Sequence, residues 1–128
     1  MVTIRSDGLV LGSAHASGEE NYSLMKLFST WGVNDFHFSP DVKEGFGDNF
    51  LLTDDQAPNT KGVKALGFSE ASAEDLKAAI KSAKVVVLLN DELVDRGVLD
   101  SEDLKKPYVI SLATNETETS TSTDLVIP

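Results

Sequence analysis

The 128-residue sequence contains no cysteine, and this absence removes several kinds of chemistry. Disulfides, thiolate zinc sites, cysteine-ligated iron–sulfur clusters and cysteine nucleophiles all need a thiol, so this chain cannot supply them. The absence fits a reducing compartment. Basic residues are also scarce, because 11 lysines and arginines face 21 acids and give a net charge of −10. A nucleic-acid partner needs a basic surface that displaces phosphate counterions, so the charge argues against one.

Long apolar runs are missing as well. No stretch approaches the roughly 20 apolar residues of a membrane-spanning helix, and Met1–Gly8 is too polar for a secretion signal. We therefore expect a cytoplasmic chain without direct membrane insertion. No repeat or linker divides the sequence, and 41% of its residues are hydrophobic, which is enough for a core. Residues 1–128 are predicted to form a single domain, as a fragment of a larger protein.

The segment Val85–Asn90 is the centre of the predicted fold, because it begins with five consecutive branched aliphatic residues. β-Branched side chains favour strands, and a strand that is apolar at every position has both faces covered. Such strands are typical of parallel sheets enclosed between helices. The pattern predicts a three-layer α/β domain with a Rossmann-like or flavodoxin-like, mostly parallel sheet.

Five strands alternate with helices in this prediction. Their expected spatial order is 2-1-3-4-5, which places the first strand beside Val85–Asn90. In chain order the five are Leu9–Ala14, Asp35–Ser39, Val85–Asn90, Tyr108–Ala113 and Asp124–Pro128. A short leading strand could occupy Val2–Arg5. The polar run Asn115–Thr123 is predicted to be a solvated loop.

Two helices carry recognisable start signals. Ser17-Gly-Glu-Glu20 fits a capping box for a helix that reaches about Trp31, and Ser72-Ala-Glu-Asp75 fits a second one. Asn59 is expected to cap a short helix that extends through Leu66. Helical spacing predicts one apolar face on the first helix, formed by Leu24, Leu27, Phe28 and Trp31.

Ligands in such folds bind outside the carboxyl ends of the strands, where the strand order reverses. The predicted crevice is formed by Ala14–Ser17, Asn90–Glu92 and Thr114–Glu118. Its candidate cofactor-binding contacts are Ser13, His15, Ser17, Asn90 and Thr114. No catalytic residue is assigned among them. The GxGxxG fingerprint of a dinucleotide site is absent, because Gly12 and Gly18 have the wrong interval.

Acidic residues at this crevice leave two interpretations open. They could hold a divalent cation through oxygen ligands, or they could form a solvated acidic rim. These acids are Glu19, Glu20, Asp91, Glu92, Glu116 and Glu118. A receiver-like phosphorylation site is disfavoured, because no lysine follows Lys106. Neither His15 nor His37 has a second histidine at ligand spacing, so no metal site is predicted. His15 could act as a general acid–base if Ser13 or Glu19 lay beside it.

Three segments together resemble a known family. Ser17–Tyr22 resembles the helix start (S/T)NEENY, and Asp54–Gly62 with Leu66-Gly67 resembles the loop PNTRGA…LG. Thr114–Thr119 through Asp124–Pro128 resembles xxTETAxxADVVLP. In this order they resemble the molybdopterin-oxidoreductase-like region of the G subunit of bacterial NADH–quinone oxidoreductase, respiratory complex I. Gly18 stands where that family prefers asparagine.

The resemblance implies a Rossmann-like domain whose parent subunit carries iron–sulfur clusters outside this chain. It further implies a structural, non-catalytic role without molybdopterin beside the electron-transfer module. Other domains and subunits of the respiratory complex would be its partners, which would hold it at the periphery of the inner membrane. Two alternatives stay open. The chain could hold half of a pterin dinucleotide in a molybdenum oxidoreductase, or it could be a free-standing enzyme that uses His15 with Glu19 or Glu20.

Overall fold

A computed structural model describes residues 7–48 and 50–128. The centre of the sheet is β4 (Val85–Leu89), and all five of its residues are buried. It lies between β1 (Gly8–Leu11) and β5 (Tyr108–Leu112), and both pairings are parallel. The prediction of a central strand covered on both faces is therefore confirmed. The leading strand expected at Val2–Arg5 lies outside the described residues.

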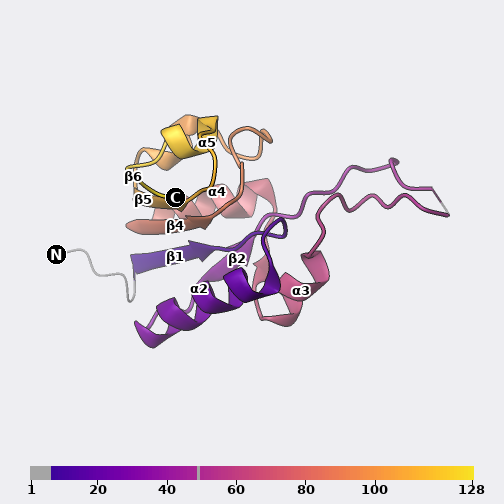
Figure 1. Ribbon diagram of the computed structural model, residues 1–128. Helices are drawn as coiled ribbons and strands as arrows, with labels where there is room; N and C mark the ends of the chain where they lie inside the picture. The colour runs from indigo at the N-terminus through magenta and orange to yellow at the C-terminus, as the bar shows by residue number, and fades with distance from the viewer. Residues whose placement is uncertain (1–6, 49) are drawn as a thin grey trace.

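The described strands form one parallel sheet in the order β3-β2-β1-β4-β5-β6 (Figure 1). The remaining strands are β2 (Phe36–Phe38), β3 (Ser69–Glu70) and β6 (Leu125–Ile127). The α/β class is confirmed, and the five expected strands keep their relative order. The predicted order was incomplete, because β3 adds a sixth strand at the edge. Both residues of β3 are exposed, so no apolar pattern signals this strand.

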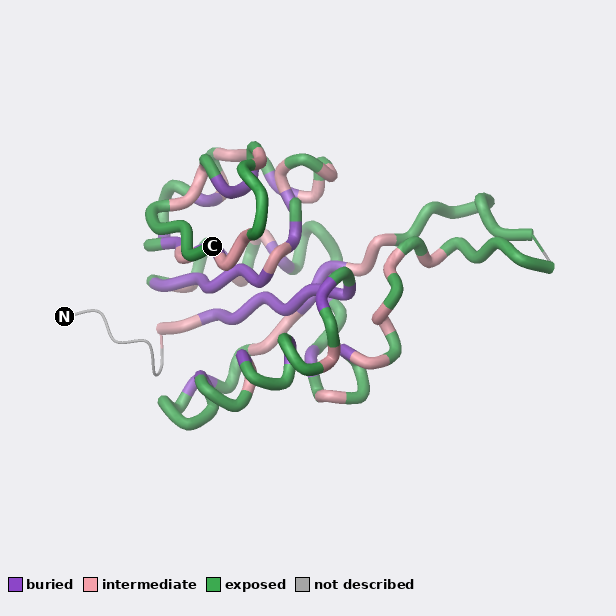
Figure 2. Tube along the Cα trace, in the orientation of Figure 1, coloured by how far each residue is buried: buried purple, intermediate pink, exposed green. Residues whose placement is uncertain are grey.

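Helices cover the two faces of the sheet and divide the core into two clusters. On one face lie α2 (Gly18–Thr30) and α3 (Thr60–Ala65), and on the other lie α4 (Ala73–Ser82) and the short 3₁₀ helix η1 (Ser101–Leu104). Leu24 and Phe28 of α2 share one cluster with Val87. Leu76 of α4 shares the other cluster with Leu88. Figure 2 shows the buried central strands between these layers.

The helix starts largely follow the predicted capping chemistry. At α2 the Glu20 amide donates to Ser17 Oγ (3.1 Å), and the Ser17 amide donates to Glu20 Oε2 (2.7 Å), which is a complete capping box. At α4 the Asp75 amide donates to Ser72 Oγ (3.2 Å), which is the first of the two expected bonds. The α2 helix ends before Gly32, whose φ of +87° suits glycine.

Two details of the helices differ from the prediction. The apolar face of α2 is turned, so Asn21 is fully buried while Leu27 and Trp31 are 47% and 46% exposed. The position of Asn21 is explained by its hydrogen bonds in the β1–α2 loop, which no apolar periodicity reveals. The expected cap of α3 is wrong, because the Asn59 side chain makes no cap bond. The side-chain Nδ2 of Asn59 instead donates to the Ala16 carbonyl (3.1 Å), and this bond joins α3 to the β1–α2 loop.

The run Asn115–Thr123 was predicted to be a solvated loop, and this prediction is wrong. It contains α5 (Glu118–Thr121), in which Thr119 and Ser120 are buried. The Ser120 amide donates to Thr117 Oγ1 (3.2 Å), and the Thr117 amide donates to Ser120 Oγ (2.8 Å). The polar side chains satisfy the helix terminus reciprocally, so this segment can be buried without apolar residues.

An extended arm, residues 41–56, leaves the body between β2 and α3 (Figures 1 and 2). Backbone hydrogen bonds join its two sides, from the Lys43 amide to the Asp54 carbonyl (2.7 Å) and from the Gln56 amide to the Asp41 carbonyl (2.8 Å). Most of the arm is exposed. The arm is therefore a hairpin-like projection, held by its own backbone rather than by the core.

Candidate functional site

The strand order reverses between β1 and β4, and ligands of this fold bind beyond their carboxyl ends. A cleft of about 430 Å³ opens at this point. Its lining residues are His15, Asp41, Asn90, Asp91, Glu92, Arg96, Thr114 and Asn115. Of the five sequence candidates, three line the cleft, namely His15, Asn90 and Thr114. Ser13 and Ser17 do not line it.

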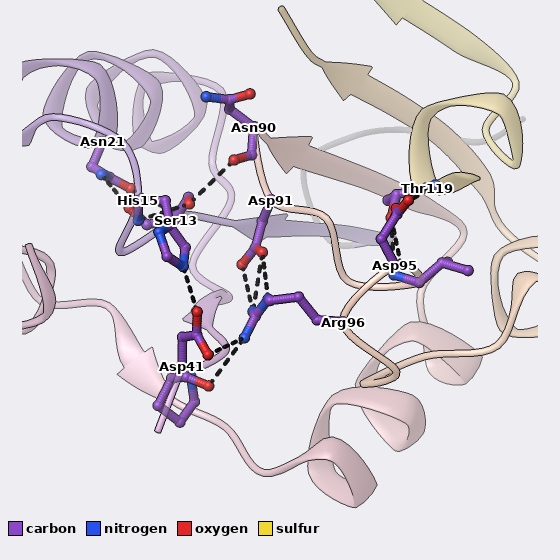
Figure 3. Close-up of polar contacts among 11 residues, drawn as sticks. Ser13, His15, Asn21, Asp41, Asn90, Asp91, Asp95, Arg96 and Thr119 are labelled. Atoms are coloured by element: carbon purple, nitrogen blue, oxygen red, sulfur yellow. Dashed lines mark hydrogen bonds and ion pairs between the residues drawn. The ribbon is translucent and has the colours of Figure 1, made fainter. Parts of the chain in front are cut away.

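The floor of the cleft is a buried ion pair between Asp91 and Arg96 (Figure 3). Arg96 Nε donates to Asp91 Oδ1 (3.1 Å) and Arg96 Nη2 donates to Asp91 Oδ2 (3.0 Å), so the pair is bidentate. The side chain of Asp91 is 3% exposed and that of Arg96 is 17% exposed. Burial raises the pKa of Asp91 above its ordinary value, although the charge of Arg96 acts in the opposite direction.

Arg96 also holds the base of the arm. Its Nη1 donates to the Pro40 carbonyl (3.4 Å) and lies 3.7 Å from Asp41 Oδ1. The other oxygen of Asp41 lies 2.9 Å from Nε2 of His15 (Figure 3). Asp91, Arg96, Asp41 and His15 therefore form one continuous polar chain across the cleft. This chain links the end of β4, the base of the arm and the loop after β1.

Asp41 and Arg96 were not among the sequence candidates. The sequence left open whether Ser13 or Glu19 lies beside His15, and the structure gives the imidazole ring a different partner. The ring bonds to Asp41, while the contact with Ser13 is a backbone one, from the His15 amide to Ser13 Oγ (3.1 Å). Glu20, the other acid considered for His15, is held by the Ser17 amide in the capping box.

Ser13 and Ser17 have structural contacts instead of a place in the cleft. Ser13 is fully buried, and its Oγ donates to the Asn90 carbonyl (3.4 Å). Asn21 holds the same loop, since its Oδ1 accepts from the Ser13 amide (2.9 Å) and its Nδ2 donates to the Ser13 carbonyl (2.8 Å). A Cβ at Gly12 would come within 2.6 Å of Asn21 Oδ1, so glycine is required at that position.

The loop after β4 is fixed by two further residues. Asn90 has a φ of +37°, a region that asparagine tolerates better than most residues. Its Oδ1 accepts from Thr114 Oγ1 (3.4 Å). Asp95 then accepts from the Thr119 hydroxyl (2.6 Å) and amide (2.9 Å), which lowers the pKa of Asp95. These contacts lock the loop against α5 and keep Arg96 directed into the cleft.

The acids at the crevice differ in their exposure to solvent. Glu19, Glu20, Glu92, Glu116 and Glu118 are exposed, as a solvated rim requires, whereas Asp91 is buried in its ion pair. Within residues 7–48 and 50–128 no group of three or more histidine and acidic side chains is arranged to hold a metal ion. No serine or threonine hydroxyl donates to the His15 ring in the described part of the chain. The contact that the structure gives the ring is the carboxylate of Asp41.

Comparison with protein-family models, with curated proteins and with solved structures returned no match for this chain. The likeness to the complex I subunit therefore rests on the three sequence segments that carry it. Among the helices in the described residues, none combines the length and the apolar character needed to cross a membrane.

Proposed function

We propose that the chain is a non-catalytic, structural domain of an NADH–quinone oxidoreductase G-type subunit, packed beside the iron–sulfur electron-transfer module. The observation that carries a packing role is the apolar face at the β5–β6 edge of the sheet, where Tyr108, Leu125 and Ile127 are left uncovered. The sequence resemblance supports the choice of the parent complex. The pairing of Arg96 with acids in the crevice supports a non-catalytic role.

The uncovered face follows from the register of the parallel strands. Ile110 and Leu112 are half-buried and pack against the α2-side cluster, and their partners Leu125 and Ile127 point to the same side of the sheet. Leu125 and Ile127 are 43% and 45% exposed, and Tyr108 on the same face is 51% exposed. Figure 1 shows α2 beneath β1 and β2, away from β6. A contiguous apolar face of this kind marks a surface that packs against other protein.

The crevice supports a structural role because the arginine in its lining is already paired with two carboxylates. Arg96 is the cation best placed to hold a phosphate, and it is occupied by Asp91 and Asp41. The N-terminus of α2 carries the carboxylates of Glu19 and Glu20, which repel an anion at the position where this fold usually binds one. A dinucleotide would therefore have to break an internal ion pair in order to bind.

The experiment isolates the full chain from cells that make it naturally, after mild detergent extraction and size fractionation. We expect it to migrate with iron–sulfur polypeptides that oxidise NADH. An Ile127→Asp variant should leave that fraction, whereas Leu27→Asp on α2, which is equally exposed, should remain. A chain that migrates alone, or with polypeptides that lack redox activity, would overturn the proposal.

Titration of the purified chain with pterin guanine dinucleotide separates the structural role from the alternative of a pterin-binding domain. We expect no binding up to millimolar ligand. Saturable binding in the micromolar range would replace the structural role with that of a pterin-binding domain. An Arg96→Met variant serves as the control, because specific binding in the cleft should respond to the loss of its central cation.

A further inference from the structure

The end of the arm exposes three neighbouring large apolar side chains. Phe50 is 87% exposed, Leu51 is 78% exposed and Leu52 is 47% exposed. We call these three residues the apolar tip. Figure 2 shows this end of the arm extending well away from the body of the domain. Scattered apolar residues are common on protein surfaces, but a consecutive group on a projecting element marks an interaction surface.

The backbone of the apolar tip is fixed by one carboxylate. Asp48 Oδ1 accepts hydrogen bonds from the amides of Phe50 (2.8 Å), Leu51 (2.7 Å) and Leu52 (2.9 Å). The Asp48 amide donates in turn to the Leu52 carbonyl (2.9 Å). These hydrogen bonds lower the pKa of Asp48, and the bond from the Leu52 amide contributes most to that decrease. The amides of Phe50, Leu51 and Leu52 therefore share one anchor, while their side chains remain exposed.

The two sides of the arm also approach closely beneath the tip. The Gly47 amide donates to Asp54 Oδ1 (2.7 Å), and a Cβ at Gly47 would lie 3.1 Å from the Leu52 carbonyl oxygen and the Asp54 nitrogen. A larger residue at Gly47 would push the sides apart. Because the conformation is set before contact, a partner does not have to order the arm, and this lowers the entropic cost of binding.

Charge indicates which partner fits. Glu44, Asp48 and Asp54 are exposed acids of the arm, and its base Lys43 lies over the ring of Phe46, 4.9 Å from the ring centroid. An anionic lipid surface repels such an element. A second copy of the chain carries the same charge of −10 and repels it too.

We infer that the apolar tip docks into an apolar pocket with a basic rim on a different protein. Fixed apolar side chains fill the pocket, and the surrounding carboxylates face lysine or arginine at its edge. The inference rests on the proposed function in one respect, because the partner is expected within the same redox complex. It uses a surface separate from the uncovered face of β5 and β6.

The test places a photo-reactive benzoylphenylalanine at Leu51 in the full chain, within cells that make it naturally. Irradiation followed by mass spectrometry should identify one segment of another polypeptide, apolar and flanked by lysine or arginine. The same probe at Tyr22, which is 50% exposed on α2, is the control and should not reach that segment. Products with lipid or with the same chain, or no product beyond the control, would overturn the inference.

A Leu51→Asp variant separates this inference from the proposed function. The side chain is largely exposed, so the melting temperature should stay unchanged while recovery of the chain with its partner falls at least tenfold. If both variant and wild type enter the redox complex equally, the docking inference fails and the proposed function stands. If the tip crosslinks to a basic pocket in a complex without redox activity, the proposed function fails and the docking inference stands.

Discussion

Replacing Arg96 with methionine is expected to leave Asp91 as a buried carboxylate without a partner. The side chain of Asp91 is 3% exposed, and both of its oxygens accept from Arg96. Removing one member of a buried ion pair costs about 3–5 kcal/mol of stability. Since Arg96 itself is 17% exposed, water reaches part of the site, and we expect about 3 kcal/mol. That corresponds to a decrease in melting temperature of roughly 12 °C for a domain of this size.

The stability lost in the Arg96→Met variant should depend on pH in a defined direction. The pKa of Asp91 in the folded protein is raised by burial, so the folded state holds this proton more tightly than the unfolded state. The free energy of unfolding therefore falls as the pH rises from the ordinary aspartate range through the raised pKa. Without Arg96 the pKa rises further. The cost of Arg96→Met should be largest at neutral pH and should shrink as acid protonates Asp91.

Urea denaturation followed by circular dichroism, repeated over a series of pH values, measures this effect. The double variant Arg96→Met with Asp91→Asn is the control, because it removes the buried charge together with its partner. We expect the double variant to recover much of the lost stability at neutral pH. A loss that is the same at every pH, or a double variant no more stable than Arg96→Met, would refute the reasoning.

Three further predictions concern stability and the arm. Ser17→Ala should cost about 1 kcal/mol through loss of the α2 cap, whereas Ser23→Ala, exposed in the same helix, should change unfolding little; equal losses would contradict the cap. Leu76→Ala removes a fully buried side chain and should cost about 2–5 kcal/mol in the same assay. Asp48→Ala should speed hydrogen exchange at the Phe50–Leu52 amides without altering global unfolding. Because the pKa of Asp48 is lowered, acid should produce the same loss in the wild type only below the ordinary aspartate range; pH-independent exchange protection would contradict this.

The fold could be predicted from the sequence because its strongest signals are local. Five consecutive apolar residues mark β4, and the pattern of strands and helices sets the parallel order around it. β3 gave no such signal, because it consists of Ser69 and Glu70 and is held to β2 through backbone pairing at the sheet edge. α5 was missed for a different reason. Its buried residues are Thr119 and Ser120, whose burial depends on hydrogen-bond partners and not on apolar character.

The site could be predicted only in part, because its geometry depends on contacts between distant segments. The rule for strand ends located His15, Asn90 and Thr114. Asp41 lies 26 positions from His15, and nothing in its local sequence indicates that the arm returns to the cleft. Arg96 did carry a signal, as the lone base in the acidic stretch from Asp91 to Asp103. A single cation among acids in a loop beside buried strands indicates an internal partner.

The arm is inserted into one connection of the sheet, and its two ends meet where the Gln56 amide donates to the Asp41 carbonyl at 2.8 Å. The entropy of closing such a loop grows only slowly with its length, so the core is insensitive to what lies beyond this closure. The length of the arm and the residues of its apolar tip can therefore change without altering the core of the domain. Exchanging the segment between Lys43 and Asp54 would therefore give the same domain a different binding partner while its core stays as it is.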